Sequence, residues 1–242
     1  MPNLKIAIAF SLAAIIVLAG GIGRASVIVF DRVALVNQPV QLAVRTKGRL
    51  LPKGGERVIL FVGGNRLKQI LTGGDGYGYL MHTPPETGLI KIEAVHEDKS
   101  ESGFILVMSA QDRVVLVDVE TALRGSAITP RLREGSSRAI ESLNRAYRVI
   151  YLYTLTGLTL NRQWLNSNRL PASVVLPWGN AAVIKTLERL GIHTHAIVGS
   201  AGQLKSADKS IPHRFSFEET IEGLRIDSWA DVLEALEINA PQ

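Results

Sequence analysis

Three hydrophobic patterns follow one another along the chain. Positions 6–22 form an apolar run in which Ser11 is the only polar residue. A helix of that length rises about 26 Å, the short end of what crosses a bilayer core. From Ser26 to Met108, short stretches alternate apolar and polar residues, as half-buried strands do. From Arg113 onward, apolar runs alternate with helical periodicity. The patterns predict a transmembrane helix (1–25), a strand-rich domain (26–110) and an α/β domain (111–242).

The N-terminal run has two interpretations. The first is an uncleaved signal-anchor, with Lys5 before the run and Arg24 after it. The alternative is a secretory signal cleaved at 23–25, but the run is long for a signal and Arg24 is unfavourable at a cleavage site. We therefore expect a single-pass membrane protein. Because positive charges lie on both sides, charge alone leaves the orientation open, and we expect the folded domains to be extracytoplasmic.

The strand-rich region predicts an antiparallel β-sandwich. Its alternating segments include 40–44, 57–62 and 89–95, and Gly- and Pro-rich turns separate them. Positions 74–94 resemble bacterial Ig-like domains, with a D-x-G turn, an alternating strand, a T-P-P segment and a last strand ending in alanine. The resemblance implies a sandwich that serves as a spacer or adhesion module.

The last region predicts a largely parallel, five-stranded sheet with helices on both faces. The strands are expected at 114–117, 149–153, 174–176 and 196–198, and helices at 137–147, 159–168 and 180–190. Two further helix starts are indicated by a capping-box sequence at Ser216 and by Ser228.

Two carboxylates mark the candidate site. Asp118 ends an apolar run and Glu120 follows two residues later, where ligands bind in open α/β sheets. Asp118 could instead cap the adjacent loop by accepting its amides. Lys185 lies on an amphipathic helix, where an ordinary solvated side chain is the plain alternative.

The region also resembles the haloacid dehalogenase-like superfamily, and within it the lipin-type phosphatidate phosphatases. The matching elements are Asp118–Leu123 for D-x-D-G-T-L, a strand ending at Thr154, an R-x-W-L segment from Arg162, Lys185 for the motif lysine, and Gly199-Ser200 for the final G-D. The resemblance implies a three-layer, Rossmann-like fold. It implies Asp118 as nucleophile and Mg²⁺ ligand, Glu120 as acid, Thr154 as phosphoryl contact and Lys185 as charge-neutralising group.

The departures from that pattern weaken the catalytic hypothesis. Glu120 replaces an aspartate, and Ser200 stands where the metal-binding aspartate belongs. Leu204 supplies no second carboxylate, and Asp208 is the nearest acid. Because Mg²⁺ prefers several oxygen ligands, Asp118 would hold it weakly. We therefore expect a pseudoenzyme with no cofactor, or with Mg²⁺ if it is active.

The composition of the chain limits the classes of partner that we expect. The net charge is +5 and the pI about 9.6, but basic residues are scattered among acids and aromatics are 6% of the chain. That pattern disfavours nucleic acid and suits an anionic membrane surface. The chain has no cysteine, so it forms no disulfides and the compartment stays open. His193 and His195 alternate, but no third ligand lies at zinc spacing.

The sequence thus favours a membrane-anchored binding or scaffold protein, a structural subunit of a larger membrane complex. Its expected partners are the lipid bilayer and other membrane-protein subunits. The alternative is a Mg²⁺-dependent phosphatase acting on phosphatidate or another phosphate ester near the membrane. An adhesion or spacing protein led by the Ig-like half is a third hypothesis.

Overall fold

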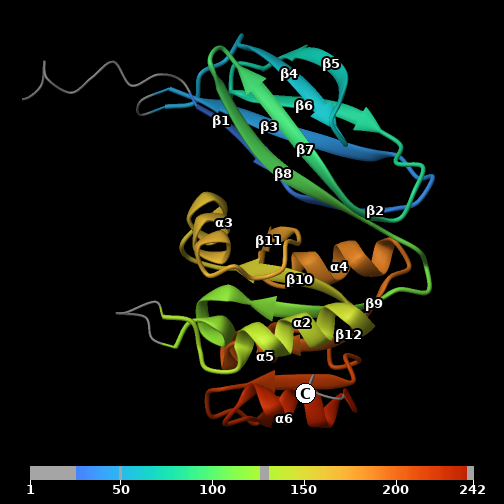
Figure 1. Cartoon of the computed structure of the whole chain (residues 1–242), viewed down its shortest axis with the longest axis vertical. Helices are drawn as coiled ribbons and strands as arrows, with labels where there is room; N and C mark the ends of the chain where they lie inside the picture. Colours follow the sequence, from blue (N-terminus) through green and yellow to red (C-terminus); the bar gives the residue numbers. More distant parts are fainter. Residues whose placement is uncertain (1–25, 49–50, 126–130, 239–242) are drawn as a thin grey trace, which may run out of the picture.

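The computed structural model describes residues 26–48, 51–125 and 131–238. Two halves are stacked along the long axis (Figure 1). The first contains these strands: β1 (Ser26–Phe30), β2 (Arg32–Leu35), β3 (Val40–Lys47), β4 (Arg57–Val62), β5 (Asn65–Leu71), β6 (Tyr77–His82), β7 (Gly88–His96) and β8 (Lys99–Met108). The second contains these strands: β9 (Arg113–Asp118), β10 (Arg148–Tyr153), β11 (Val175–Pro177), β12 (His193–Val198), β13 (His213–Ser216) and β14 (Leu224–Arg225). Its helices are η1 (Val119–Leu123, π-helical), α2 (Ser136–Ala146), α3 (Leu158–Ser167), α4 (Ala182–Arg189), α5 (Ala201–Ser206) and α6 (Trp229–Ala235).

The first half is a β-sandwich. One sheet has the order β1-β3-β6 and the other β2-β8-β7-β4-β5. Side chains such as Leu42, Leu60 and Ile105 fill the space between the sheets. The expected all-antiparallel arrangement is wrong at one pair, because β2 runs parallel to β8. The extended chain of β1 bends at Asp31 and continues as β2 in the other sheet, as strands at sandwich corners do.

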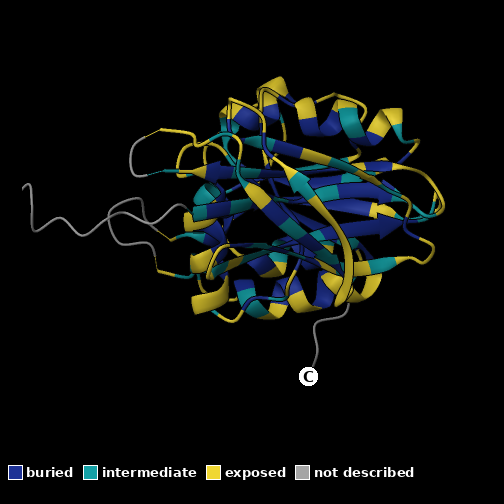
Figure 2. Ribbon diagram, turned by 90° about the horizontal axis from the view of Figure 1, so that it is seen from above, coloured by how far each residue is buried: buried dark blue, intermediate teal, exposed yellow. Residues whose placement is uncertain are grey.

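The second half contains a parallel sheet of order β11-β10-β9-β12-β13-β14 within the described residues. The strand predicted at 114–117 lies in β9, between β10 and β12. All four of its valine and leucine side chains are buried, because helices or the sandwich cover both faces. Figure 2 shows the dark blue strands in the interior and exposed helix faces outside. The sixth strand, β14, has two residues, too few for a periodicity to predict.

The two halves share a hydrophobic core. One face of the parallel sheet packs against α2 and α6. The other face packs against α4 and against Val33, Leu106 and Met108 of the sandwich. Strands β2 and β8 therefore belong to the sandwich and also cover part of one face of the parallel sheet.

Of the two helix starts predicted from capping residues, one is present in the structure and one is not. Ser228 caps α6 through a capping box with Asp231, as predicted. The prediction at Ser216 was wrong, because Ser216 ends β13 and the chain runs on to β14. Helix α4 begins later than expected, since Asn180 and Ala181 both have positive φ, a left-handed conformation that precedes the first turn.

The transmembrane part of the expected fold class finds no support. In the ranges given above, every helix is too short or too polar to cross a bilayer. The apolar run at 6–22 and the cleavage site at 23–25 lie outside the described residues. Of the residues that the structure describes, 41% lie in strands and 23% in helices, so strands are the more abundant element.

Candidate functional site

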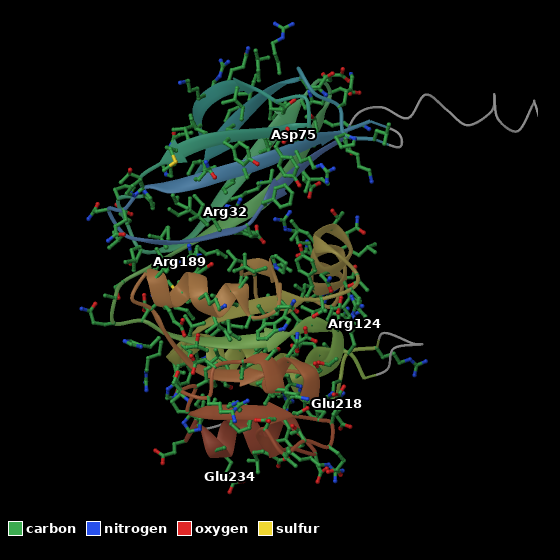
Figure 3. The ribbon with its side chains drawn as sticks, turned by 180° about the vertical axis from the view of Figure 1, so that it is seen from behind. Arg32, Asp75, Arg124, Arg189, Glu218 and Glu234 are labelled. Atoms are coloured by element: carbon green, nitrogen blue, oxygen red, sulfur yellow. The ribbon has the colours of Figure 1, made fainter. Side chains whose placement is uncertain are left out.

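The two carboxylates lie where β9 and β10 end. These strands are parallel neighbours, with Leu152 opposite Asp118, so Asp118 and Thr154 reach the same edge of the sheet. Arg124, just after η1, and Glu218, just after β13, lie at this same end of the second half (Figure 3). The edge is therefore the position at which ligands bind in open parallel sheets.

Asp118 is the cap of η1. The residue is 1% exposed, and its Oδ2 accepts hydrogen bonds from the Thr121 amide at 2.8 Å and the Thr121 hydroxyl at 2.7 Å. Asp118 thus has the capping role that the sequence offered as the alternative to catalysis. A side chain engaged in this way is held in one orientation by the turn that follows it.

Gln203 of α5 occupies the other side of Asp118. Its Nε2 donates to Asp118 Oδ1 at 2.9 Å and to Thr154 Oγ1 at 3.2 Å, while its Oε1 accepts from the Ser200 amide at 2.9 Å. Gln203 and Asp118 are at least 95% buried, whereas Thr154 is exposed. The Gln203 amide therefore fills the space between two candidate site residues that a substrate would need to enter.

The chemistry of Asp118 follows from these contacts. Burial raises the pKa of its carboxyl, and the hydrogen bonds from Gln203 and Thr121 oppose that rise without cancelling it. The nearby Glu120 charge raises the pKa further. All the donors are neutral, so no cation in this network favours the ionised form.

Glu120 points into a row of backbone amides. Its carboxylate accepts from the amides of Thr154 at 3.1 Å, Leu155 at 2.9 Å and Thr156 at 2.7 Å, and from the Thr156 hydroxyl at 2.6 Å. Burial opposes ionisation, but these hydrogen bonds prevail and lower the pKa of Glu120. Successive amides of this kind form an anion-binding nest, and here the chain's own carboxylate fills it.

Lys185 is not joined to this group. It is exposed on α4, and its backbone carbonyl accepts from Arg189 Nε at 3.2 Å. In the part of the chain that the structure describes, no hydrogen bond or ion pair links its ammonium to Asp118. The structure thus brings Asp118, Glu120 and Thr154 to one edge and leaves Lys185 as a solvated helix residue.

The ligand set does not fit Mg²⁺. The Gln203 N–H group, rather than an oxygen, faces Asp118 Oδ1. Ser200 caps α5, Leu204 is buried, and Asp208 accepts from the Ser210 amide in an exposed turn. Mg²⁺ requires several oxygen ligands in near-octahedral geometry, and this edge turns a donor toward the carboxylate instead.

Sequence reasoning missed a second buried carboxylate, at the seam between the halves. Asp31 Oδ1 accepts from the Phe104 amide and from Arg162 Nη2, both at 2.6 Å, and Oδ2 accepts from the Val175 amide at 2.7 Å. Arg162 Nη2 also donates to the Val29 carbonyl at 2.7 Å. Asp31 therefore ties β8, α3 and β11 together. An available signal was its phase, since Val27, Val29, Asp31 and Val33 alternate inward.

A pocket of about 340 Å³ opens at this seam. Glu101 and Ser102 of β8 line one side, and Arg162 and Asn166 of α3 line the other. Arg162 is only 9% exposed and is already paired with Asp31. The pocket is thus built around the contact that holds the halves together.

Comparisons with known proteins give only remote likenesses among solved structures. No family model and no curated protein matches the chain. Among solved structures, the D0–D1 domain of intimin is 14% identical over 35% of this chain and 49% of its own, with a TM-score of 0.28. The Yersinia pseudotuberculosis adhesin InvE is 11% identical over 36% and 32%, with a TM-score of 0.29. Domain I81 of titin is 14% identical over 36% and 99%, with a TM-score of 0.28. The chain spans about half of the intimin fragment.

These findings correct the assignment to the haloacid dehalogenase-like superfamily and its lipin-type members. The neighbours are Ig-like sandwich domains, and no haloacid dehalogenase or phosphatase is indicated. The motif at Asp118–Leu123 has a local explanation, because a strand that ends in a capping aspartate produces the same spacing.

Proposed function

We propose that this protein acts by binding, as a scaffold subunit of a larger assembly, and that no reaction takes place at the Asp118 edge. The observation that carries the proposal is the internal occupation of that edge. Gln203 hydrogen-bonds Asp118 and Thr154, and Glu120 fills the amide nest. A nucleophile needs an open approach to the reacting atom, and these contacts close it.

The open edge of the sandwich is the surface to which we assign binding. Strands β5 and β6 end their respective sheets and contact each other. They expose Leu67, Leu71, Tyr79 and Met81. An edge strand offers unpaired backbone groups to an extended segment of another protein. Because Arg66 and Lys68 are exposed on β5, an apolar segment with acidic residues is the partner that fits.

An extracytoplasmic location, expected from the sequence, is part of this proposal. Adhesin and S-layer proteins are among the neighbours.

The test combines native mass measurement with an activity assay on the full chain. Gentle extraction from its source should give a stoichiometric complex with wild type and with Leu224→Lys, an equally exposed position in the second half. Met81→Lys and Leu71→Lys should release the partner. A monomer at all concentrations would contradict the binding role.

The activity arm uses p-nitrophenyl phosphate and phosphatidate with Mg²⁺. We expect turnover no higher than that of Asp118→Asn. Hydrolysis that this substitution abolishes would show that the Asp118 edge is catalytic and overturn the proposal.

A further inference from the structure

A group of possible metal ligands lies in the sandwich, where β4 begins and β7 ends. Glu56 directly precedes β4, His96 ends β7, and Glu97 begins the turn after it. Because β4 and β7 are antiparallel neighbours, the start of one meets the end of the other. One ligand atom from each residue lies within 4.8 Å of the other two.

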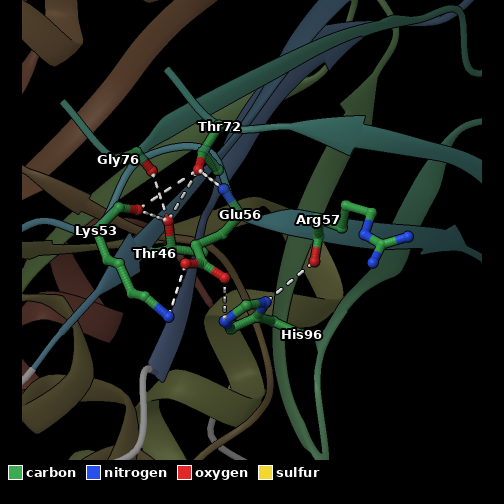
Figure 4. Close-up of polar contacts among 7 residues, drawn as sticks. All are labelled: Thr46, Lys53, Glu56, Arg57, Thr72, Gly76 and His96. Carbon is green, nitrogen blue, oxygen red and sulfur yellow. Dashed lines mark hydrogen bonds and ion pairs between the residues drawn. The ribbon is translucent and has the colours of Figure 1, made fainter. Parts of the chain in front are cut away.

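His96 is oriented for coordination. Its Nδ1 lies 3.0 Å from the Arg57 carbonyl oxygen, and a carbonyl only accepts, so Nδ1 is the donor. The other nitrogen, Nε2, is buried, makes no hydrogen bond with the described residues, and faces Glu56 Oε2 (Figure 4). The side chain is 2% exposed, so bulk solvent does not reach this nitrogen. A histidine held by a carbonyl on one nitrogen is typical of metal ligands.

The distance between Nε2 and Oε2 supports the same interpretation. It is 3.4 Å, longer than the roughly 2.7–2.9 Å of a charge-assisted hydrogen bond. Two ligands bound tetrahedrally at about 2.0–2.1 Å from a zinc ion are about 3.3–3.4 Å apart. The two atoms are therefore spaced as neighbouring ligands of one ion.

The surrounding contacts hold Glu56 in place and leave one oxygen available. Lys53 Nζ binds Oε1 at 2.7 Å, on the side away from His96. The buried hydroxyls of Thr46 and Thr72 contact the Lys53 carbonyl and fix the segment that carries both residues (Figure 4). A metal on Oε2 would not displace Lys53.

We propose that Glu56, His96 and Glu97 form a site for a divalent transition-metal ion of the zinc class. Imidazole with two carboxylates suits such an ion better than Mg²⁺ or Ca²⁺, which take oxygen ligands. Three protein ligands leave a fourth position for water or for a side chain of a partner. The site is independent of the binding role proposed above.

The experiment uses the full-length protein, stripped with a chelator and titrated with Zn²⁺ by calorimetry. We expect one ion per chain at this site, a rise in the thermal unfolding midpoint, and reversal by the chelator. Glu97→Gln should weaken Zn²⁺ binding at least tenfold. Losing a group that merely orients a ligand typically lowers metal affinity about 10- to 100-fold, and Glu97 is itself a proposed ligand. Glu56→Gln should do the same, and Glu86→Gln, an exposed carboxylate in the same half, should bind like wild type.

Co²⁺ provides a second readout. Bound in place of Zn²⁺, it should give the intense visible absorption of a four-coordinate site, lost in His96→Gln. If that variant fails to fold, as circular dichroism would reveal, the exposed Glu97→Gln keeps the test valid. Zn²⁺ binding that is absent in wild type, or that survives both Glu56→Gln and Glu97→Gln unchanged, overturns the proposal.

Discussion

The seam and the sheet edge each bury an aspartate, and they stabilise it in different ways. Asp31 and Asp118 are 2% and 1% exposed, and burial raises the pKa of both. Asp31 faces the Arg162 guanidinium, whose charge opposes that rise. Asp118 faces only neutral amides and a hydroxyl.

This difference separates a structural ion pair from a capping residue. At the seam, removing Arg162 leaves the buried Asp31 without its counterion, and removing Asp31 leaves Arg162 with only the longer, 3.8 Å contact to Glu101. At the edge, all the donors to Asp118 are neutral, so a neutral side chain of similar shape leaves no charge without a partner. A buried carboxylate at the end of a parallel strand is therefore not by itself a catalytic signal.

The largest expected effect is at the seam. Asp31→Ala should lower the free energy of unfolding by about 3–5 kcal/mol, because Arg162 stays buried without its partner. Urea denaturation of the full chain measures it. The double variant Asp31→Leu with Arg162→Met should recover part of this loss. A single variant as stable as wild type would show that the pair does not hold the halves together.

The next effect concerns Gln203. Gln203→Ala should cost about 1–3 kcal/mol, since the buried Asp118 Oδ1 loses its donor inside the protein. Gln203→Glu should cost more at neutral pH, because a second carboxyl meets Asp118, and less on acidification. Chemical denaturation at two pH values checks both. An unchanged Gln203→Ala would mean that the amide does not occupy the edge in solution.

A smaller effect is expected for Asp118→Asn. The variant keeps the side chain's shape and one acceptor oxygen, and removes a desolvated charge, so we expect a loss of about 1 kcal/mol. Lys185→Ala, at an exposed position, should stay within about 0.5 kcal/mol. Thermal melts compare them with Asp31→Asn. If Asp118→Asn were the most damaging of the three, the contrast between the two aspartates would be wrong.

The smallest effect is the pH dependence, and its sign differs between neighbouring carboxylates. The pKa of Glu120 is lowered from its ordinary 4.5, so its contribution to stability is present above that value and is lost as pH falls through the folded pKa. The pKa of Asp118 is raised from 3.8, so its contribution is greatest below 3.8 and declines as pH rises through the folded pKa.

Unfolding free energies between pH 3 and 7 test these signs against matched variants. On acidification, wild type should lose stability relative to Glu120→Gln and gain it relative to Asp118→Asn. Parallel profiles for the two variants would show that the hydrogen bonds from the 154–156 amides do not set the titration of Glu120.

Much of the local structure could be predicted from residue patterns. The change from period-two alternation to longer apolar runs near position 110 separates β8 from β9, and the run at 114–117 lies in a strand buried on both faces. Ser228 with Asp231 marked the start of α6. Ser216 failed by the same rule, because its hydroxyl accepts from the Glu218 amide in a turn while its backbone stays in β13. A capping sequence thus describes a local hydrogen bond and does not require a helix.

The candidate site was predicted only in part. Asp118, Glu120 and Thr154 meet because parallel strands end at one edge, which the order of strands and helices implies. Lys185 does not join them, since amphipathic spacing in a helix fixes its buried face and not the direction of its polar one.

The sequence by itself determined which positions are buried, where the period changes and where acids end strands, because these depend on neighbours a few residues apart. Only the tertiary structure decided which groups satisfy the buried carboxylates. Gln203 reaches Asp118 from 85 positions away, and Arg162 reaches Asp31 from 131. Hydropathy periodicity carries no information about such partners, since any donor of suitable length could meet a buried oxygen. The pairing of the strands into sheets and the packing of α3 against β11 and of α5 against β13 select the one that does.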